Sequence, residues 1–481
     1  MSYLLFAPEL ALIVGSLAVF AISLGTNRGR LAARVTAITA LVNLGLCLAS
    51  VSESGTLFYQ AYRVDLFSQL FKCFIALGLL AVVLFGGRLK DIRESIRPEF
   101  FLFLILGTLG LTMLVSSSEL ITLFVTLELS SYALYLLVPL RRERPGLRIQ
   151  MESAAKYVMF GVVSTGFLLF GMSYLYGLTG STYFNEIAPA LALKWQEPAA
   201  LAAMVLVLAG LLFKLAAFPM HLWAPDVYQG ASNETTAFIA GVPKVGVIAV
   251  LIRFLLCADP SRETLSSELL CLVLSVVAIG SMCFGNLAAL VQKDIKRMLG
   301  YSSIAHAGYV LLGLVTLRAA GYASAMFYIF GFLAMSLAAF LVICQVSKDG
   351  ENVMVDDLSG LHKRNPLAAF LLAVSMFGLA GIPPFVGFIG KFLLLSEALR
   401  NGFVLLVVVA AVNTAIGIYY YLSVVRVMYM AAPEDRPNVR LDNGVAITGV
   451  ALIVLVTLLG VLPWSLLEAV TRATARLAAG P

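Results

Sequence analysis

The sequence predicts an all-α polytopic membrane protein with about fourteen transmembrane helices. Hydrophobic residues occupy 60% of the 481 positions and charged residues only 12%, and the mean hydropathy is +0.95. Apolar runs long enough to span a bilayer follow one another along the whole chain, and the hydrophilic connections between them are short. The N-terminal run lacks the basic n-region of a cleaved signal peptide, so we expect it to be the first spanning helix.

The spanning segments follow from the criterion of about 20 consecutive apolar residues. The expected limits are 3–24, 31–51, 66–86, 100–116, 119–140, 152–178, 199–219, 236–257, 267–290, 300–317, 320–346, 366–399 (broken near 382–385), 402–430 and 444–467.

Lysine and arginine are distributed unevenly between alternate connections. One set of connections holds nineteen of them, and the opposite set with the C-terminal tail holds seven. Basic connections face the cytoplasm, so both termini are expected on the periplasmic side. This asymmetry also explains the net charge of +6 without nucleic-acid binding.

Two broken apolar segments contain the features around which the chain is organised. Lys214 closes a long apolar run, and Pro219 and Pro225 follow it within twelve residues. In the second half, GIPPFVGFIGKF combines a proline pair with Lys391. Transporters commonly form ion sites at membrane depth from a charged side chain beside a helix break. Because both halves of the chain contain this combination, the sequence indicates an internal repeat.

Several further ionisable residues lie inside apolar segments, where a charge at a helix centre costs about 2.5–3.5 kcal/mol. The expected proton-path residues are Glu128, Lys214, Lys244 and Lys391, with Lys156 and His306 as auxiliary relay groups. For Glu128 the alternative is a structural ion pair, for Lys156 snorkelling to the surface, and for His306 an ordinary core histidine. The remaining charges, which we interpret mostly as snorkelling or paired structural groups, are Lys72, Arg253, Glu397 and Arg426.

A row of lysines with one glutamate suits proton movement. Removal from water disfavours the charged form of a lysine, and a nearby carboxylate favours it, so a modest change in their coupling can pass a proton along. The six cysteines lie in or beside apolar runs without CxxC spacing, which argues against a metal, haem or iron–sulfur site on this chain. No nucleotide loop or catalytic triad is evident.

Four motifs carry a resemblance to a known family. KLAAFPMHLWAPDVYQGA, GVPKVG, QKDIKRMLGYSSIAHAGY and LAGIPPFVGFIGKF resemble subunit N of bacterial NADH–quinone oxidoreductase (respiratory complex I), one of its antiporter-like membrane subunits. The resemblance covers about residues 100 to 430 and implies two inverted five-helix repeats. The implied divisions are 1–99 for an N-terminal three-helix segment, 100–258 and 259–430 for the two repeats, and 431–481 for a C-terminal helix.

The resemblance also implies a function and residue roles. The subunit would move protons, coupled to quinone reduction elsewhere in the complex. Glu128 would be the carboxylate of the fifth helix, Lys214 the broken-helix lysine and Lys244 the central lysine of the eighth helix. Lys391 would lie toward the exit half-channel, and Lys156 and His306 would assist.

Cofactors, partners and location follow from the same resemblance. NADH, FMN, iron–sulfur clusters and quinone are expected on other subunits, and none on this chain. The expected partners are other membrane subunits, especially sibling antiporter-like ones, and lipid, with quinone only indirectly and no nucleic acid. The expected location is the bacterial inner membrane.

The sequence departs from the family at one loop and leaves other functions open. Where the family usually has GAPTPVTAF, this chain reads GASNETTAF, which lacks both prolines and adds Glu234. A sodium/proton exchanger subunit shares the repeat and would respond to sodium gradients without quinone. A stand-alone solute carrier would purify as a monomer with a bound metabolite, and a membrane scaffold would tolerate swapped charge pairs.

Overall fold

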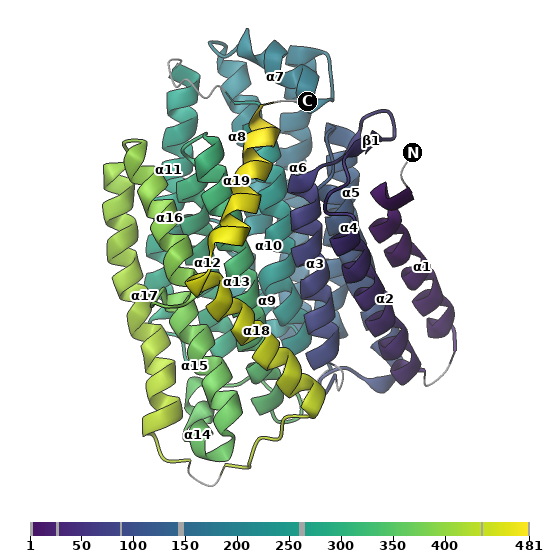
Figure 1. The fold of residues 1–481 in the computed structure, drawn as a ribbon, viewed down its shortest axis with the longest axis vertical. Coiled ribbons are helices and arrows are strands. Elements are labelled where there is room, and N and C mark those ends of the chain that lie inside the picture. The colour runs from purple at the N-terminus through teal and green to yellow at the C-terminus, as the bar shows by residue number, and fades with distance from the viewer. Residues whose placement is uncertain are drawn as a thin grey trace.

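A computed structural model describes residues 3–25, 28–86, 89–142, 149–258, 265–433 and 436–479. Four arginines counted for the orientation, Arg88, Arg144, Arg148 and Arg262, lie outside these ranges. The described chain forms a bundle of helices with one short hairpin (Figure 1). Both chain termini lie at the same end of this bundle, as the charge pattern predicts, and α14 lies at the other end.

The helices of the first half have the following bounds: α1 (Ala7–Ser23), α2 (Gly29–Ala49), α3 (Leu66–Phe85), α4 (Arg97–Leu114), α5 (Leu120–Leu137), α6 (Ile149–Thr179), α7 (Phe184–Ala192), α8 (Pro198–Leu215), α9 (Trp223–Gly230) and α10 (Asn233–Leu255). Those of the second half are α11 (Leu265–Ala289), α12 (Ile295–Leu314), α13 (Ala319–Val346), α14 (Leu361–Arg364), α15 (Pro366–Ala380), α16 (Val386–Arg400), α17 (Val404–Met430), α18 (Asn443–Val461) and α19 (Trp464–Ala478). Strands β1 (Gly55–Leu57) and β2 (Tyr62–Val64) pair antiparallel between α2 and α3, with Thr56 opposite Arg63. Short 3₁₀ turns occupy Tyr3–Leu5, Glu94–Ile96, Val138–Leu140 and Val355–Leu358.

The predicted spans agree with these helices. Among the described residues, eleven helices are long and apolar enough to cross a membrane, and α1 and α15 are shorter apolar helices. The protein is therefore a multi-pass membrane protein. The helix α12 begins five residues before the expected segment, because Asp294 accepts hydrogen bonds from the backbone N–H groups of Lys296 and Arg297 and caps it. The last expected segment is shorter than predicted, because α18 ends at Val461 and Pro463 precedes the separate helix α19.

Both predicted breaks are present. The helix α8 ends at Leu215, and Ala216 takes the left-handed conformation (φ +62°) before α9 begins at Trp223. The helix α15 ends at Ala380, and Gly381 (φ +85°) precedes α16. A left-handed residue commonly ends a helix, and glycine adopts it without the steric cost that alanine bears. The two breaks therefore share one local geometry.

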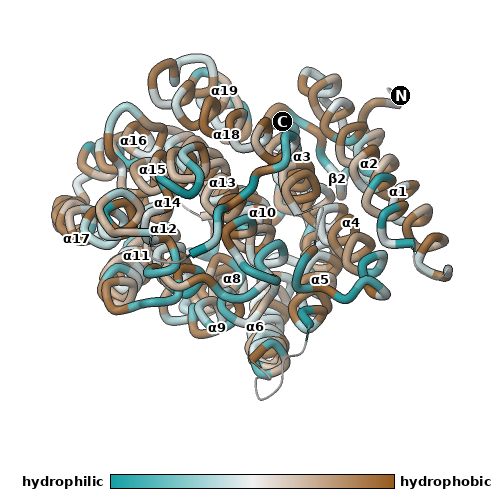
Figure 2. Tube along the Cα trace, turned by 90° about the horizontal axis from the view of Figure 1, so that it is seen from below, coloured by the Kyte–Doolittle hydropathy of each residue, from teal (hydrophilic) through white to brown (hydrophobic). Residues whose placement is uncertain are grey.

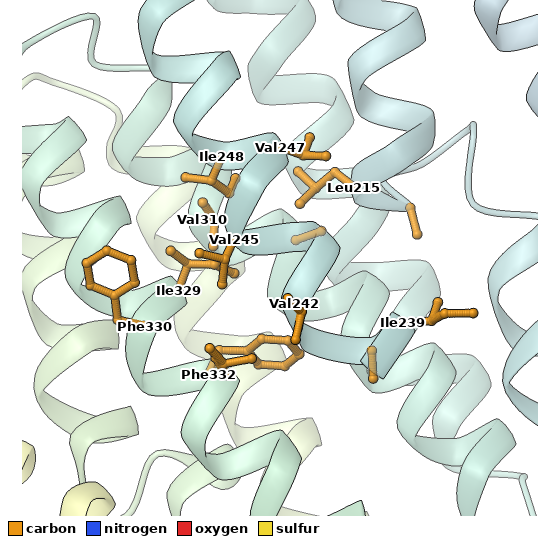
Figure 3. Close-up of a cluster of buried hydrophobic side chains, with 14 of the residues drawn as sticks. Leu215, Ile239, Val242, Val245, Val247, Ile248, Val310, Ile329, Phe330 and Phe332 are labelled. Carbon is orange, nitrogen blue, oxygen red and sulfur yellow. The ribbon is translucent and has the colours of Figure 1, made fainter. Parts of the chain in front are cut away.

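The centre of the bundle is formed by α10 and α13, whose spanning windows are completely buried, whereas α6 and α17 are mostly exposed toward the surroundings. The end-on view in Figure 2 places α10 and α13 inside the ring of other helices. Figure 3 shows apolar side chains of α10 packed among Leu215, Val310 and Phe332, which come from α8, α12 and α13.

Small residues let the helices approach closely, which is how helices associate in lipid, where apolar burial alone gives little driving force. A Cβ atom on Gly110 of α4 would lie 2.6 Å from the backbone nitrogen of Ser130 on α5. A Cβ atom on Gly285 of α11 would lie 2.6 Å from the backbone nitrogen of Ala305 on α12. The first two helices of each expected repeat thus meet through a glycine.

Candidate functional site: a row of buried ionisable side chains

The first pair joins α5 and α8. The Nζ atom of Lys214 lies 3.7 Å from Oε1 of Glu128, and both side chains are buried. Lys214 also donates to Ser131 Oγ at 2.7 Å and to Tyr135 OH at 3.0 Å. Thr165 of α6 donates to Glu128 Oε1 at 2.9 Å. Three helices therefore satisfy this charge pair, as a buried ion pair requires.

A small cavity lies beside Lys214 on the side of α10. Its volume is about 10 Å³, and its lining includes Tyr157, Lys214 and Pro243. That is close to the space one water molecule needs, and the hydroxyl and ammonium groups offer it polar partners. The cavity thus joins the side chain of Lys214 to the face of α10 that carries Ile239, Pro243 and Val247.

Lys244 occupies the completely buried helix α10. Its Nζ atom donates to the backbone oxygen of Ser303 on α12 at 3.0 Å and lies 5.8 Å from the centre of the Phe332 ring. The hydroxyl of Ser303 donates to Tyr228 OH at 3.1 Å. No carboxylate lies within 4 Å of this ammonium group among the described residues. The carbonyl and the aromatic face are its contacts.

His306 lies between Lys244 and Lys391, and both lysines act on it electrostatically. Its Nδ1 atom is 2.5 Å from Tyr328 OH, and its Nε2 atom is 2.9 Å from Tyr421 OH. Each ring nitrogen thus has a hydroxyl that can give or take a proton. Such an arrangement is chemically able to relay a proton, and it also satisfies both ring nitrogens of a buried histidine.

Lys391 reaches back across the second break. Its Nζ atom donates to the backbone oxygens of Leu379 and Ala380 at 3.0 and 3.1 Å, and it lies 4.8 Å from the centre of the Tyr309 ring. These carbonyls close α15 and have no partner in the next turn because the helix stops there. The break therefore supplies the acceptors that hold the ammonium group.

A polar network continues beyond Tyr309. Thr414 Oγ1 donates to Tyr309 OH at 3.0 Å. Asn286 Nδ2 donates to Asn413 Oδ1 at 3.2 Å, and Tyr420 OH donates to Asn286 Oδ1 at 3.0 Å. These groups come from α11, α12 and α17 and extend the polar row past the last lysine.

Lys156 lies apart from the other predicted residues. Its side chain is 40% exposed and pairs with Glu152 at 2.7 Å and with Asp226 at 2.8 Å. Asp226 also accepts from Arg297 at 2.7 Å. Lys156 therefore belongs to a surface ion cluster that ties α6, α9 and α12 together at one end of the bundle. The structure brings Glu128, Lys214, Lys244, His306 and Lys391 into one row without it.

Two of the charges interpreted as structural are in buried pairs. Lys72 lies 2.9 Å from Glu9 with both side chains fully buried, and Arg253 lies 3.0 Å from Asp65. Glu397 pairs with the exposed Arg400, and Arg426 is exposed. Sequence reasoning missed Glu9, although a carboxylate one residue after Pro8 in the first apolar segment was a usable signal.

The hydroxyl partners of the row were also missed. Sequence reasoning gave no role to Ser131, Tyr135, Thr165, Tyr228, Tyr328 or Tyr421. The signal available was weak, since single Ser, Thr and Tyr residues are scattered through the apolar runs. All six cysteines are free, and no group of three or more metal-binding side chains occurs within the described ranges.

The fold and the row define a class: a multi-pass α-helical membrane protein with two broken helices and buried lysines at both breaks. The family described as "NADH:quinone oxidoreductase/Mrp antiporter, TM" matches residues 117–417. NADH-quinone oxidoreductase subunit N 2 of Opitutus terrae is 51% identical over 475 residues, covering 98% of both chains.

Solved structures agree. A chain of respiratory complex I from Thermus thermophilus matches with a TM-score of 0.82 at 33% identity, covering 96% of this chain and 99% of that one. A chain of the Mrp complex from Dietzia sp. DQ12-45-1b has a TM-score of 0.86 at 23% identity, covering 99% and 98%, which supports the fold alone. The chain belongs to the NADH:quinone oxidoreductase/Mrp antiporter membrane family and, within it, to the NADH–quinone oxidoreductase subunit N proteins.

Proposed function

We propose that this chain moves protons across the membrane as a non-redox subunit of a bacterial NADH–quinone oxidoreductase, a proton-pumping translocase. The energy comes from quinone reduction elsewhere in the complex. The observation that carries the proposal is the buried Glu128–Lys214 pair at a helix break, followed by further buried lysines. Relatives that bear the name of subunit N favour this function over a sodium/proton exchanger subunit.

The proposed proton path follows the row. Glu128 holds Lys214 charged, and weakening this contact releases a proton toward Lys244 through the water-sized cavity beside Pro243. His306 connects Lys244 to Lys391 through Tyr328 and Tyr421. Lys156 acts as an auxiliary group at the edge of the path, through its contact with Asp226.

The assembly proposed here follows from the relatives. The chain contacts other membrane subunits of complex I, especially sibling antiporter-like subunits, and lipid. NADH, FMN, iron–sulfur clusters and quinone are held by other subunits. The chain lies in the bacterial inner membrane with both termini in the periplasm. Its divisions are 1–99, the repeats 100–258 and 259–430, and the C-terminal part 431–481.

The test is Lys214→Ala in the assembled complex. Proton uptake is measured in inverted membrane vesicles during quinone reduction. We expect uptake to fall while the complex still assembles, because the alanine variant removes the ammonium group that pairs with Glu128 at this break. Lys363→Ala, which alters an exposed lysine of α14, is the matched control and should leave uptake unchanged. Normal uptake in both variants would refute the proposal.

The same vesicles distinguish the nearest alternative. Exchange activity supported by a sodium gradient without quinone would assign the chain to an exchanger, and quinone-dependent uptake that is insensitive to sodium supports the function proposed here.

A further inference from the structure

Glu234 is a buried carboxylate at the beginning of the central helix. It is the second residue of α10, and Ser232 caps this helix by accepting a hydrogen bond from the backbone N–H of Thr235 at 3.2 Å. A carboxylate is favoured in the first turn of a helix by the helix dipole. Glu234 is nevertheless only 5% exposed, and a Cβ atom on Gly86 at the end of α3 would lie 3.1 Å from its Cγ atom. The side chain is enclosed between α3 and α10.

One oxygen of this carboxylate has no partner. The Oε2 atom of Glu234 is buried without a hydrogen bond from any described residue. An unsatisfied buried polar atom costs roughly 1–3 kcal/mol, and more for a charged group, so such atoms are rare and call for an explanation. An apolar side chain at this position would avoid this cost. A carboxylate that takes up and releases a proton explains it.

The groups that face Glu234 come from every element packed around it. They are Lys90 and Asp91 after α3, Lys296 at the start of α12, and Cys344 near the end of α13. Each cation here is held by another acceptor. Lys296 Nζ donates to the Ala231 oxygen at 2.8 Å, and Lys90 Nζ donates to the Ser347 oxygen at 3.0 Å.

Arg141, the remaining cation near Glu234, also has other partners. Arg141 forms an ion pair with Asp91 and donates to the backbone oxygens of Gln229 and Gly230. Because these cations are committed to carbonyls or to Asp91, none of them closes a hydrogen bond to Glu234 Oε2. Lys90 and Lys296 act on the Glu234 carboxylate electrostatically but do not hydrogen-bond to its Oε2 atom.

Polar groups of α9 and α12 lie alongside α10 between Glu234 and Lys244, and we call Lys296, Tyr228 and Ser303 the column. The two residues are ten positions apart on α10, which is about 15 Å along the helix. On α12, Lys296 and Ser303 are seven positions apart and therefore lie on one face. Lys296 contacts Ala231 just before Glu234, and Ser303 accepts from Lys244 through its backbone oxygen. Tyr228, bonded to the Ser303 hydroxyl, lies between them.

A surface cavity lies at the outer end of this column. Its volume is about 380 Å³, and it is lined by Lys90, Arg93, Glu94, Arg97 and Arg142 among others. Lys90 both lines this cavity and acts electrostatically on Glu234. The chain after α3 that lines this cavity lies at the end of the bundle opposite the two termini (Figure 1), and Lys90 is the residue shared by the cavity and the surroundings of Glu234.

We propose that Glu234 is a proton-accepting station that supplies Lys244 from this end of the bundle. The carboxylate takes a proton from a hydronium ion in the cavity beside Lys90, which forms an O–H bond on Glu234 and leaves a water molecule behind. That bond then breaks as the proton passes along the Lys296–Tyr228–Ser303 column and forms an N–H bond on the Lys244 amine, which regenerates the carboxylate. This role rests on the proposed function and adds a residue that the motifs of the family do not contain.

The test compares Glu234→Gln with Glu234→Asp in the assembled complex. Glutamine keeps the shape and packing of the side chain but does not ionise, and aspartate keeps the carboxyl group. Proton uptake and quinone reduction are both measured from pH 6 to pH 8.5. We expect Glu234→Gln to lose uptake progressively as pH rises, because direct capture from dilute bulk protons becomes limiting, while Glu234→Asp restores most of the loss.

Three other outcomes overturn the proposal. They are normal uptake in Glu234→Gln at every pH, a loss that is equal at every pH, and a loss of uptake that only follows reduced assembly. An infrared difference spectrum adds a second readout, since a carboxyl band that appears during turnover should be missing from Glu234→Gln. Lys214→Ala is measured in parallel. If Lys214→Ala pumps normally, the proposed function itself fails, and if only Glu234→Gln pumps normally, the station alone is wrong.

Discussion

The fully buried pair of Glu9 and Lys72 allows a double-mutant cycle with a calculable outcome. The Nζ and Oε1 atoms are 2.9 Å apart, and Tyr62 OH donates to the same Oε1 atom at 2.7 Å and accepts from Lys72 at 3.0 Å. Both charged side chains are completely excluded from the surroundings. The perturbations are Glu9→Leu, Lys72→Met and the two together. Each single change leaves one buried charge without its partner.

Removing one partner of a buried ion pair costs about 3–5 kcal/mol, whereas replacing both partners with apolar groups of similar size is often neutral or stabilising. Each single variant should therefore destabilise the docking of α1 on its neighbours α2 and α4 by about this amount, and the double variant should recover nearly all of it. The coupling energy, which is the cost of the double variant minus the costs of both single variants, should be close in size to the sum of the two single costs.

The assay is maleimide labelling of Cys47, a free and fully buried thiol that packs against Cys73 beside the ion pair. Labelling of a buried thiol reports local opening of the surrounding helices. A loss of about 3–5 kcal/mol should accelerate labelling by roughly two to nearly four orders of magnitude, since each 1.4 kcal/mol is tenfold. The buried Cys344, near the C-terminal end of α13, is the internal control and should keep its rate.

Unchanged Cys47 labelling in both single variants would refute the reasoning, as would a double variant that labels as fast as the singles. Proton uptake should be retained in the double variant, because the pair lies outside the row of Glu128, Lys214, Lys244, His306 and Lys391. Loss of uptake in a stable double variant would show that Glu9 and Lys72 take part in proton movement.

Three further outcomes follow from the structure. Glu128→Gln should keep the acceptor for Thr165 and the assembled complex but lower proton uptake, and an assembled variant with normal uptake would show that the carboxylate charge is dispensable. Burial alone would raise the pKa of Asp65. The charge of Arg253 and the capping bond from Ser68 have a larger effect in the opposite direction, so the pKa lies below the ordinary value. The stabilisation is therefore complete above the ordinary pKa of about 4 and disappears as pH falls through the lower folded value; thermal unfolding should show this acid sensitivity in the wild type and lack it in Asp65→Asn. Lys156→Ala should change the free energy of unfolding by at most about 1 kcal/mol, because a half-exposed ion pair contributes little, and a large loss of thermal stability would contradict this.

The spans and breaks were predictable because they depend on local sequence. Long apolar runs specify spanning helices in lipid, where the backbone has no alternative partner. Pro219 and Pro384 mark the breaks directly, and a lysine beside each break identifies the ion site. The location of a break can therefore be predicted without knowing which helices pack together.

The partners of the buried charges were not predictable, because they come from distant parts of the chain. Thr165 reaches Glu128 from the next helix, and Tyr421 reaches His306 from 115 positions away. Nothing in a local apolar run distinguishes a tyrosine that faces such a group from one that faces lipid. The same limit explains why Glu9 was overlooked, since only the fold places it against Lys72.

Segments that neither span nor break were also missed. The hairpin of β1 and β2 is only three residues per strand, too short for a period-2 pattern to stand out. The helix α19 was merged with α18, because Pro463 was taken as part of a continuous apolar run. For Lys156 the sequence left two interpretations open, an auxiliary relay group and a lysine that reaches the surface, and its side chain pairs with Glu152 and Asp226 at the surface.

The most direct test of the central claim is the number of protons moved per quinone reduced in proteoliposomes that contain the complete complex with Lys214→Ala. A ratio, unlike a rate, does not depend on how much complex is incorporated. The account predicts a lower ratio in Lys214→Ala and a normal ratio in Lys363→Ala. A wild-type ratio in Lys214→Ala, with normal quinone reduction, would show that protons do not cross the membrane through this row of buried side chains.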